Sequence, residues 1–142
     1  MAKPVVLYVE DEESDVLLLR LACEEAGLNF DLRSVSDGEK AMQYLAGDGM
    51  FADRVLHPLP DLVILDLNLP RENGFAVLEW LRHQQQFASL PVVVYTSSVD
   101  AGDCAKAYRL GANDYVVKLS NLQGIANFAR QLNEHWLRGV VG

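Results

Sequence analysis

The chain has 142 residues, of which half are apolar and 23% are charged, and its net charge is −8. This length suits one domain of ordinary size with a proper core, and the acidic balance argues against a nucleic-acid-binding surface. No apolar run approaches the roughly 20 residues that span a bilayer, and the N-terminal residues do not resemble a signal peptide. We therefore expect a cytoplasmic protein that enters no membrane.

Cysteine and histidine give no sign of a metal site. Cys23 and Cys104 are far apart and match no ligand spacing, so we interpret them as buried or half-buried thiols in a reducing compartment. His57, His83 and His135 show no ligand spacing either. We interpret all three histidines as surface residues.

Runs of β-branched residues recur along the chain, the second of them weaker than the rest. The strong runs are nearly continuous rather than alternating, which is typical of strands buried on both faces of a parallel sheet. The pattern predicts strands at 5–9, 31–35, 62–65, 92–95 and 115–117.

Segments with helical period lie between and after these strands. Asp37 and Asp100 are candidate N-caps, and Gly27 and Gly111 are candidate C-terminal stops. Helices are predicted within 14–27 (Ser14 and Asp15 near its start), 37–49, 73–86, 99–114 and 121–141; the core face of the last comprises Leu122, Ile125, Phe128, Ala129, Leu132 and Trp136. A looser segment, 47–60, precedes the third strand. This alternation predicts a doubly wound α/β domain.

Polar side chains follow four of the predicted strands. In open parallel sheets, ligands bind beyond the carboxyl ends of the strands. The residues at those ends are Glu10 and Asp11, then Asp66, then Thr96 followed by Ser97 and Ser98, and finally Lys118. Acids, a hydroxyl and an ammonium should therefore meet at one edge of the sheet.

This combination fits phosphoryl transfer. Crowded carboxylates repel each other, which raises the pKa of one of them unless a counter-charge is present, and Mg²⁺ prefers such oxygen ligands. A lysine and a hydroxyl would donate to the oxygens of a transferring phosphoryl group. Each residue alone has a simpler explanation, as a helix start, a turn residue or a solvated lysine. Their joint placement favours a functional site.

Four segments occur in order on the predicted strand–helix units: YVEDEESD, VILDLNLPRENG, VVYTSS and GANDYVVK. Through them the chain resembles the receiver domain of two-component response regulators over essentially its whole length. The resemblance implies a flavodoxin-like five-stranded parallel sheet in the order 2-1-3-4-5, with five (βα) units. It implies one receiver domain over residues 1–142, with an extended C-terminal helix at about 121–138.

The resemblance also implies a phospho-accepting signalling protein rather than an enzyme. Asp66 would be the phospho-acceptor, taking a phosphoryl group from a phosphohistidine of a sensor histidine kinase. Asp11 would hold Mg²⁺ directly and Glu10 through water, with Asp66 and the backbone carbonyl of Asn68 as further ligands. Mn²⁺ or Ca²⁺ would be able to substitute for Mg²⁺.

Three more residues of the resemblance would respond to the phosphoryl group. Lys118 would pair with its oxygens, and Thr96 would donate its hydroxyl to one of them. Tyr115 resembles the aromatic switch that turns inward when Thr96 moves. Pro70 would stiffen the loop after the acceptor, and Gly74 fits the turn before the third helix.

One position departs from the family. Leu119 follows Lys118 where the family usually has a proline, often with a cis bond. Because a non-proline cis bond costs ~3–4 kcal/mol, we expect a trans bond or an altered loop over 118–121. No output module is recognisable in the sequence, so we expect the output to be contacts with an unknown downstream protein or onward phosphotransfer.

The last predicted helix is unusually rich in apolar residues, namely Phe128, Leu132, Trp136, Leu137, Val140 and Val141. They are either core residues or the surface of a homodimer formed through the fourth helix, fifth strand and fifth helix. The acceptor-side loop, the missing proline and the long last helix resemble single-domain regulators that serve bacteriophytochrome kinases. A bacteriophytochrome is therefore a candidate kinase partner.

Three other functions compete with this interpretation. A Mg²⁺-dependent phosphohydrolase also uses an aspartate nucleophile, but commonly needs an acid two residues later, where this chain has Asn68. A receiver-like module that no longer accepts phosphate would not need the complete set Asp11, Asp66, Thr96 and Lys118. A flavin-binding module would need a phosphate-cradling cluster of Ser, Thr and Gly after the first strand, which the sequence lacks.

Overall fold

The computed structural model describes residues 3–137. Within them a single parallel sheet runs in the order β2-β1-β3-β4-β5, with register pairs such as Tyr8 with Ile64 and Val94 with Tyr115. The strands are β1 (Val5–Val9), β2 (Asp31–Val35), β3 (Leu62–Leu65), β4 (Val92–Thr96) and β5 (Asp114–Val117). The predicted fold class and strand order are therefore confirmed.

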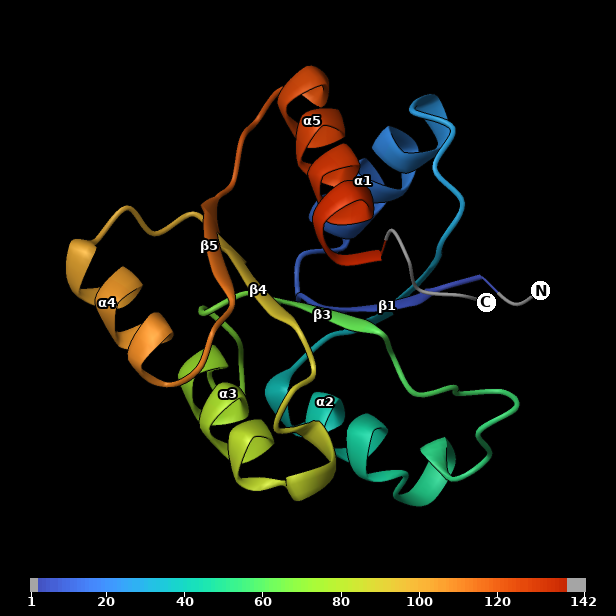
Figure 1. Ribbon diagram of the computed structural model, residues 1–142, viewed down its shortest axis with the longest axis vertical. Helices are drawn as coiled ribbons and strands as arrows, with labels where there is room; N and C mark the ends of the chain where they lie inside the picture. Colours follow the sequence, from blue (N-terminus) through green and yellow to red (C-terminus); the bar gives the residue numbers. More distant parts are fainter. Residues whose placement is uncertain (1–2, 138–142) are drawn as a thin grey trace.

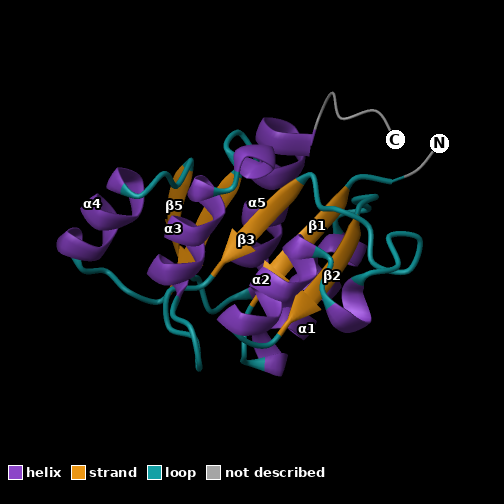
Figure 2. Cartoon of the chain, turned by 90° about the horizontal axis from the view of Figure 1, so that it is seen from below, coloured by secondary structure: helices purple, strands orange, loops and turns teal. Residues whose placement is uncertain are grey.

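Helices cover both faces of this sheet. They are α1 (Glu13–Glu25), α2 (Gly38–Ala46), α3 (Gly74–His83), α4 (Ala101–Arg109) and α5 (Leu122–Leu132), with short helical turns η1 (Gly49–Phe51), η2 (Gln85–Phe87) and η3 (Asn133–Leu137, a π-helix). Helices α1 and α5 pack on one face and α2 and α3 on the other, while α4 lies beside the edge strand β5 (Figures 1 and 2). No helix within residues 3–137 is long and apolar enough to cross a bilayer.

The continuous apolar runs are explained by two cores, one on each face of the sheet. Tyr8 and Tyr95 point into the α1–α5 core, where the Tyr95 ring stacks on Phe128 with ring centroids 3.9 Å apart. Leu7 and Leu65 point into the α2–α3 core. Every residue of β1, β3 and β4 is buried, so a polar residue at the end of these strands has little access to water.

The predicted helix caps are confirmed at four positions. Asp37 Oδ1 accepts the Lys40 N–H at 2.7 Å, and Asp100 Oδ1 accepts the Gly102 N–H at 2.6 Å. Gly27 and Gly111 each lie two residues beyond the end of a helix, α1 and α4 respectively. Their φ values of 67° and 110° are left-handed, the conformation in which glycine commonly ends a helix. Helix α1 instead begins at Glu13 without a side-chain cap, so Ser14 and Asp15 lie inside its first turn.

The apolar residues of the last helix prove to be mostly core. Phe128, Leu132 and Leu137 are buried against the sheet, so the core interpretation is confirmed for these three. Leu122 was expected on the core face but is exposed, as the first residue of α5. Val140 and Val141, and the end of the helix expected near 138, lie outside the described residues.

The segment 47–60 is held in place by one arginine. The Arg54 guanidinium donates to the carbonyl oxygens of Tyr44 at 2.7 Å and Leu45 at 2.8 Å, at the end of α2. His57 packs edge-on against Tyr44 and Phe51 with ring centroids 5.9 and 5.1 Å away. It is partly buried, whereas His83 and His135 are exposed, as expected of surface histidines.

Candidate functional site

Asp66 stands directly after β3, at the carboxyl edge of the sheet. Its N–H donates to the Val9 carbonyl at 3.1 Å, which continues the pairing with β1. The residue is buried, at 5% exposure, where a lone carboxylate would be costly. Oδ1 accepts the Asn68 N–H at 3.2 Å and Oδ2 accepts from Lys118 Nζ at 3.0 Å. The buried charge is therefore fully partnered.

Two further acids converge on Asp66 from the end of β1. One carboxylate oxygen each of Glu10, Asp11 and Asp66 lies within 4.8 Å of the others. Glu10 and Asp66 are buried and Asp11 is exposed. A set of three oxygen donors at this separation fits a hard divalent cation, which needs carboxylates and leaves its other positions to carbonyls and water.

Lys118 brings the positive charge. Its backbone N–H donates to the Thr96 carbonyl at 2.8 Å, which continues the pairing of β5 with β4. Its ammonium donates to Glu10, to Asp15 at 2.8 Å and to Asp66 at 3.0 Å. Burial alone would lower the pKa of Lys118, but these three hydrogen bonds together outweigh burial and raise its pKa. The lysine is therefore a fixed cation at any ordinary pH.

Glu10 is the most perturbed acid of the site. Burial raises the pKa of Glu10 to about 7, and the charge of Asp66 adds to the rise, while the hydrogen bond from Lys118 opposes it. The Tyr8 hydroxyl donates to Oε1 at 3.2 Å and the Glu12 N–H donates to Oε2 at 3.1 Å. Glu10 is therefore fixed in position but titrates near neutral pH in the metal-free site.

Thr96 and Tyr115 are connected by hydrogen bonds that each makes to the same residue, Ser98. Thr96 is fully buried at the end of β4, and its Oγ1 accepts the Ser98 N–H at 3.4 Å. The Tyr115 hydroxyl donates to the Ser98 carbonyl at 2.9 Å, and Ser98 Oγ donates to Asp103 of α4 at 2.7 Å. Ser98 therefore connects the threonine, the tyrosine and the first turn of α4.

The acids and the lysine border a cavity of about 570 Å³, lined by Asp11, Glu12, Asp15, Asp66, Asn68, Ser97, Lys118, Leu119 and Ser120. The structure thus brings together Asp11, Asp66, Asn68 and Lys118 of the predicted site around one opening. Glu10 contacts Lys118 from the buried side. Neither Thr96 nor Tyr115 lines the cavity.

Asp15 was not identified as a site residue from the sequence, where it was interpreted as a helix start. Its spacing from Asp11 gives no signal, because Asp11 lies before α1, which begins at Glu13, and the two acids therefore do not share a helical face.

The loop after the acceptor is clamped by close backbone contacts. A Cβ on Gly74 would lie 2.3 Å from the Asp66 carbonyl oxygen, and one on Gly38 would lie 1.9 Å from the Glu72 carbonyl oxygen. Arg71 between them has a left-handed φ of 66° and pairs with the α2 cap at 3.5 Å. The loop 67–74 therefore rests directly on the starts of α2 and α3.

The loop after Lys118 follows an ordinary path despite the missing proline. All peptide bonds in the described part of the chain are trans, as expected for Lys118–Leu119. A Cβ on Gly124 would lie 2.6 Å from Leu119 Cδ1, so the leucine side chain lies against the first turn of α5. Asn121 caps that helix by accepting the Gly124 N–H at 2.6 Å.

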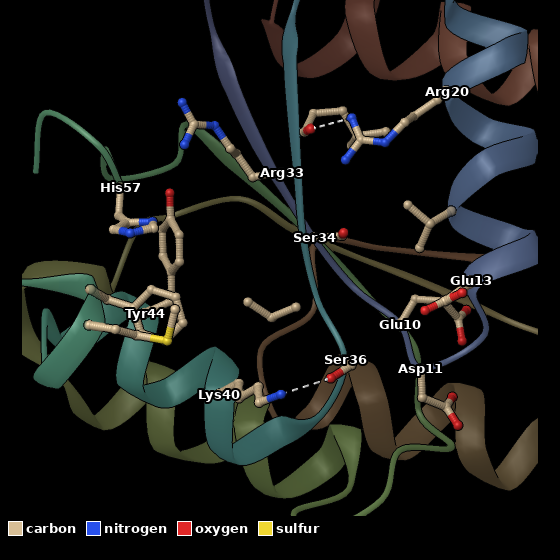
Figure 3. Close-up of a pocket in the computed structure, with 15 residues that line it drawn as sticks. Glu10, Asp11, Glu13, Arg20, Arg33, Ser34, Ser36, Lys40, Tyr44 and His57 are labelled. Carbon is tan, nitrogen blue, oxygen red and sulfur yellow. Dashed lines mark hydrogen bonds between the residues drawn. The ribbon is translucent and has the colours of Figure 1, made fainter.

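A second cavity of about 520 Å³ runs along β2 between α1 and α2, and Glu10 and Asp11 border it as well (Figure 3). Its cationic side chains are already bonded within the chain. Arg20 donates to the Leu32 carbonyl at 2.6 Å, Arg33 pairs with Asp31 at 3.0 Å, and Lys40 donates to Ser36 Oγ at 3.4 Å. These bonds brace the edge of the sheet.

Comparison with known proteins agrees with this geometry. The family model of the response regulator receiver domain matches residues 6–130. The response regulator Rcp1 of a Synechocystis species is 32% identical over 137 residues, which is 96% of this chain and 91% of Rcp1. A crystal structure of the Mn²⁺-bound form of Rcp1 superposes with a TM-score of 0.84 over 97% of each chain, at 31% identity.

Two other solved structures cover nearly the whole chain. The phosphorylated cyanobacterial phytochrome response regulator RcpA has a TM-score of 0.88 at 31% identity, over 99% of this chain and 98% of RcpA. RPA3017, a response regulator in red light signalling of R. palustris, has a TM-score of 0.90 at 37% identity, over 97% of this chain and 96% of RPA3017. The chain therefore belongs to the response regulator receiver domains, the phospho-accepting proteins of two-component signalling.

Proposed function

We propose that Asp66 accepts a phosphoryl group from a phosphohistidine of a sensor histidine kinase. The observation that carries the proposal is the position of Asp66 at a cavity, held between the Asn68 N–H and the Lys118 ammonium. In the transfer, an Asp66 carboxylate oxygen attacks phosphorus. The new P–O bond forms as the P–N bond to the kinase imidazole breaks, and that imidazole keeps the electron pair and takes up a proton.

The residues present also fit Mg²⁺ as the cofactor, with Mn²⁺ or Ca²⁺ as substitutes. Glu10, Asp11, Asp66 and the backbone carbonyl of Asn68 would hold it. When bound, the ion neutralises charge on the carboxylates and on the phosphoryl oxygens. The donor oxygens within 4.8 Å of one another support this choice, as does the similarity to a protein whose Mn²⁺-bound form is known.

The chain's own groups would carry the signal outward. The Lys118 ammonium would release the Asp66 carboxylate and donate to a phosphoryl oxygen instead. The Thr96 hydroxyl would donate to another phosphoryl oxygen. The Thr96 hydroxyl now accepts the Ser98 N–H, so this movement would disturb the residue that holds Tyr115 and α4. A phosphoryl group has a strong charge and three acceptor oxygens, and such a group is able to shift a segment like the one around Ser98 between two conformations. The output would be contacts with a downstream protein or onward phosphotransfer.

The test is phosphorylation by acetyl phosphate in Mg²⁺, followed by intact mass. Wild-type protein should gain the mass of one phosphoryl group, and D66N should gain none. The amide relieves repulsion from Glu10 and Asp11, so D66N should melt at or above the wild-type temperature. D48N, which removes an exposed acid after α2, is the control and should react normally. A phosphorylated D66N would refute the assignment.

A bacteriophytochrome is the sensor kinase that the relatives favour. One similar structure is a cyanobacterial phytochrome response regulator and another acts in red light signalling. Both partners would meet in the cytoplasm, in keeping with the two free cysteines Cys23 and Cys104. In a transfer assay, a phosphorylated bacteriophytochrome should pass its phosphoryl group to this protein faster than unrelated histidine kinases do. Equal rates would argue against this partner.

We further propose that residues 1–142 are one receiver domain whose last helix extends to about 138, and that two copies pair through α4, β5 and α5. The buried Phe128, Leu132 and Leu137 do not support pairing. Support comes from the edge strand β5 instead, where Val117 is 37% exposed, and from Tyr108 of α4, which is 46% exposed. Only Ala107 of α4 is buried, so this helix has an unused outer surface.

A further inference from the structure

Asp15 makes a contact that its place in the helix does not require. It lies in the first turn of α1, but that helix has no side-chain cap. Its Oδ2 instead accepts from Lys118 Nζ at 2.8 Å. The Lys118 side chain is only 15% exposed and that of Asp15 is 33% exposed. A pair this sheltered from solvent is screened less than the exposed ion pairs that contribute little.

Asp15 is also distinct from the acids that fit a cation. The group of carboxylates close enough to share one ion comprises Glu10, Asp11 and Asp66. Among residues 3–137, the Asp15 carboxylate accepts a hydrogen bond from Lys118 alone. The ammonium has three N–H donors, and Glu10, Asp15 and Asp66 occupy all of them. At least one of these carboxylates must therefore release Lys118 before it can donate to a phosphoryl oxygen.

We infer that Asp15 is a positioning residue that retains the Lys118 ammonium through phosphorylation while the other two carboxylates release it. This inference rests on the proposed function. When Asp66 becomes an acyl phosphate, its carboxyl group loses its own charge and the negative charge lies on the phosphoryl oxygens, while Glu10 belongs to the group that would face the cation. Asp15 is the only one of the three partners that the reaction leaves unchanged.

The hydrogen bond from Lys118 to Asp15 would keep the ammonium oriented. A lysine side chain has many rotamers, and fixing it in one of them costs conformational entropy. With one N–H held from α1, the ammonium stays beside the cavity, and its other two donors, which now bond to Glu10 and Asp66, are free to turn to a phosphoryl group. Without Asp15, the lysine would have to be ordered during the transfer itself, which slows it.

The test compares D15N with E13Q in the full chain, using the rate of phosphorylation by acetyl phosphate in Mg²⁺. Both variants remove one negative charge from the first turn of α1, but Glu13 has no contact with Lys118. D15N should react about fivefold or more slowly, as expected when a reacting group is misplaced. E13Q should react at the wild-type rate or slightly faster because it removes only a repulsive charge. D15E should recover part of the loss.

Three further measurements separate positioning from a general charge effect. In a K118A background, adding D15N should change the rate no further. In the metal-free protein, NMR of the Lys118 ammonium should show faster hydrogen exchange in D15N than in wild type or E13Q. The Kd for Mg²⁺ should change by less than about twofold, since Asp15 is not among the acids that fit the ion.

The inference is overturned if D15N and E13Q react alike, if D15N still slows the K118A protein, or if the ammonium signal is unchanged. A wild-type protein that takes up no phosphoryl group would instead refute the proposed function. The NMR comparison would then still decide whether Asp15 holds the lysine, so the two failures are distinguishable.

Discussion

At the scale of a single residue, Glu10 makes the stability of the fold depend on pH. Burial raises the pKa of Glu10 from 4.5 to about 7 in the metal-free fold. Between these two values the folded chain therefore holds a proton that the unfolded chain has released. The stability that this proton contributes is complete below the unfolded pKa and is lost as pH rises through about 7.

Urea unfolding of metal-free protein at pH 5 and pH 8 tests this dependence. From pH 5 to pH 8, the free energy of unfolding should fall by roughly 1–3 kcal/mol more in wild type than in E10Q, because the glutamine has no proton to release. Glutamine has nearly the same size, so the packing around Tyr8 is retained. Adding Mg²⁺ should stabilise wild type more at pH 8 than at pH 5, because the ion competes with the proton. Parallel pH profiles of the two proteins would show that Glu10 titrates normally.

At the scale of elements, the clamp on the loop after the acceptor depends on missing side chains. A Cβ on Gly38 would lie 1.9 Å from the Glu72 carbonyl oxygen, and that atom belongs to the backbone. G38A should destabilise the fold by roughly 1–3 kcal/mol, the usual cost of overpacking. G102A is a matched control in the first turn of α4, where the nearest atom is a side-chain oxygen of Asp100 at 2.9 Å. Equal melting temperatures for the two variants would contradict the clamp.

Sequence patterns predicted the elements well because their signals are local. The buried runs, the caps at Asp37 and Asp100 and the residues at the strand ends are all readable within a few positions. The contact of Gly38 with the loop was not readable, because it joins segments more than thirty residues apart. The hydrogen bond between Asp15 and Lys118 also joins distant segments of the chain. It was missed because an acid at a helix start already had a sufficient local explanation.

At the scale of the whole molecule, pairing through α4, β5 and α5 is open to direct measurement. Light scattering at roughly tens of micromolar should report a dimer, with or without beryllium fluoride, because pairing would cover the unused edge of β5. V117E should shift the protein to a monomer by placing charge in the interface. V55E, on the 47–60 segment where Val55 is 88% exposed, should not. A wild-type monomer in both conditions would refute the dimer.

Because of the close contacts at Gly38 and Gly74, the structure around Asp66 is more rigid on one side than on the other. On the α2–α3 side, backbone lies against backbone, and little movement is possible without breaking the packing. On the α4 side, the connections are single hydrogen bonds through Ser98, one of them as long as 3.4 Å. New charge on Asp66 would therefore meet rigid packing on the α2–α3 side and weaker contacts on the α4 side. This asymmetry would direct the signal towards α4 and β5 before any partner binds.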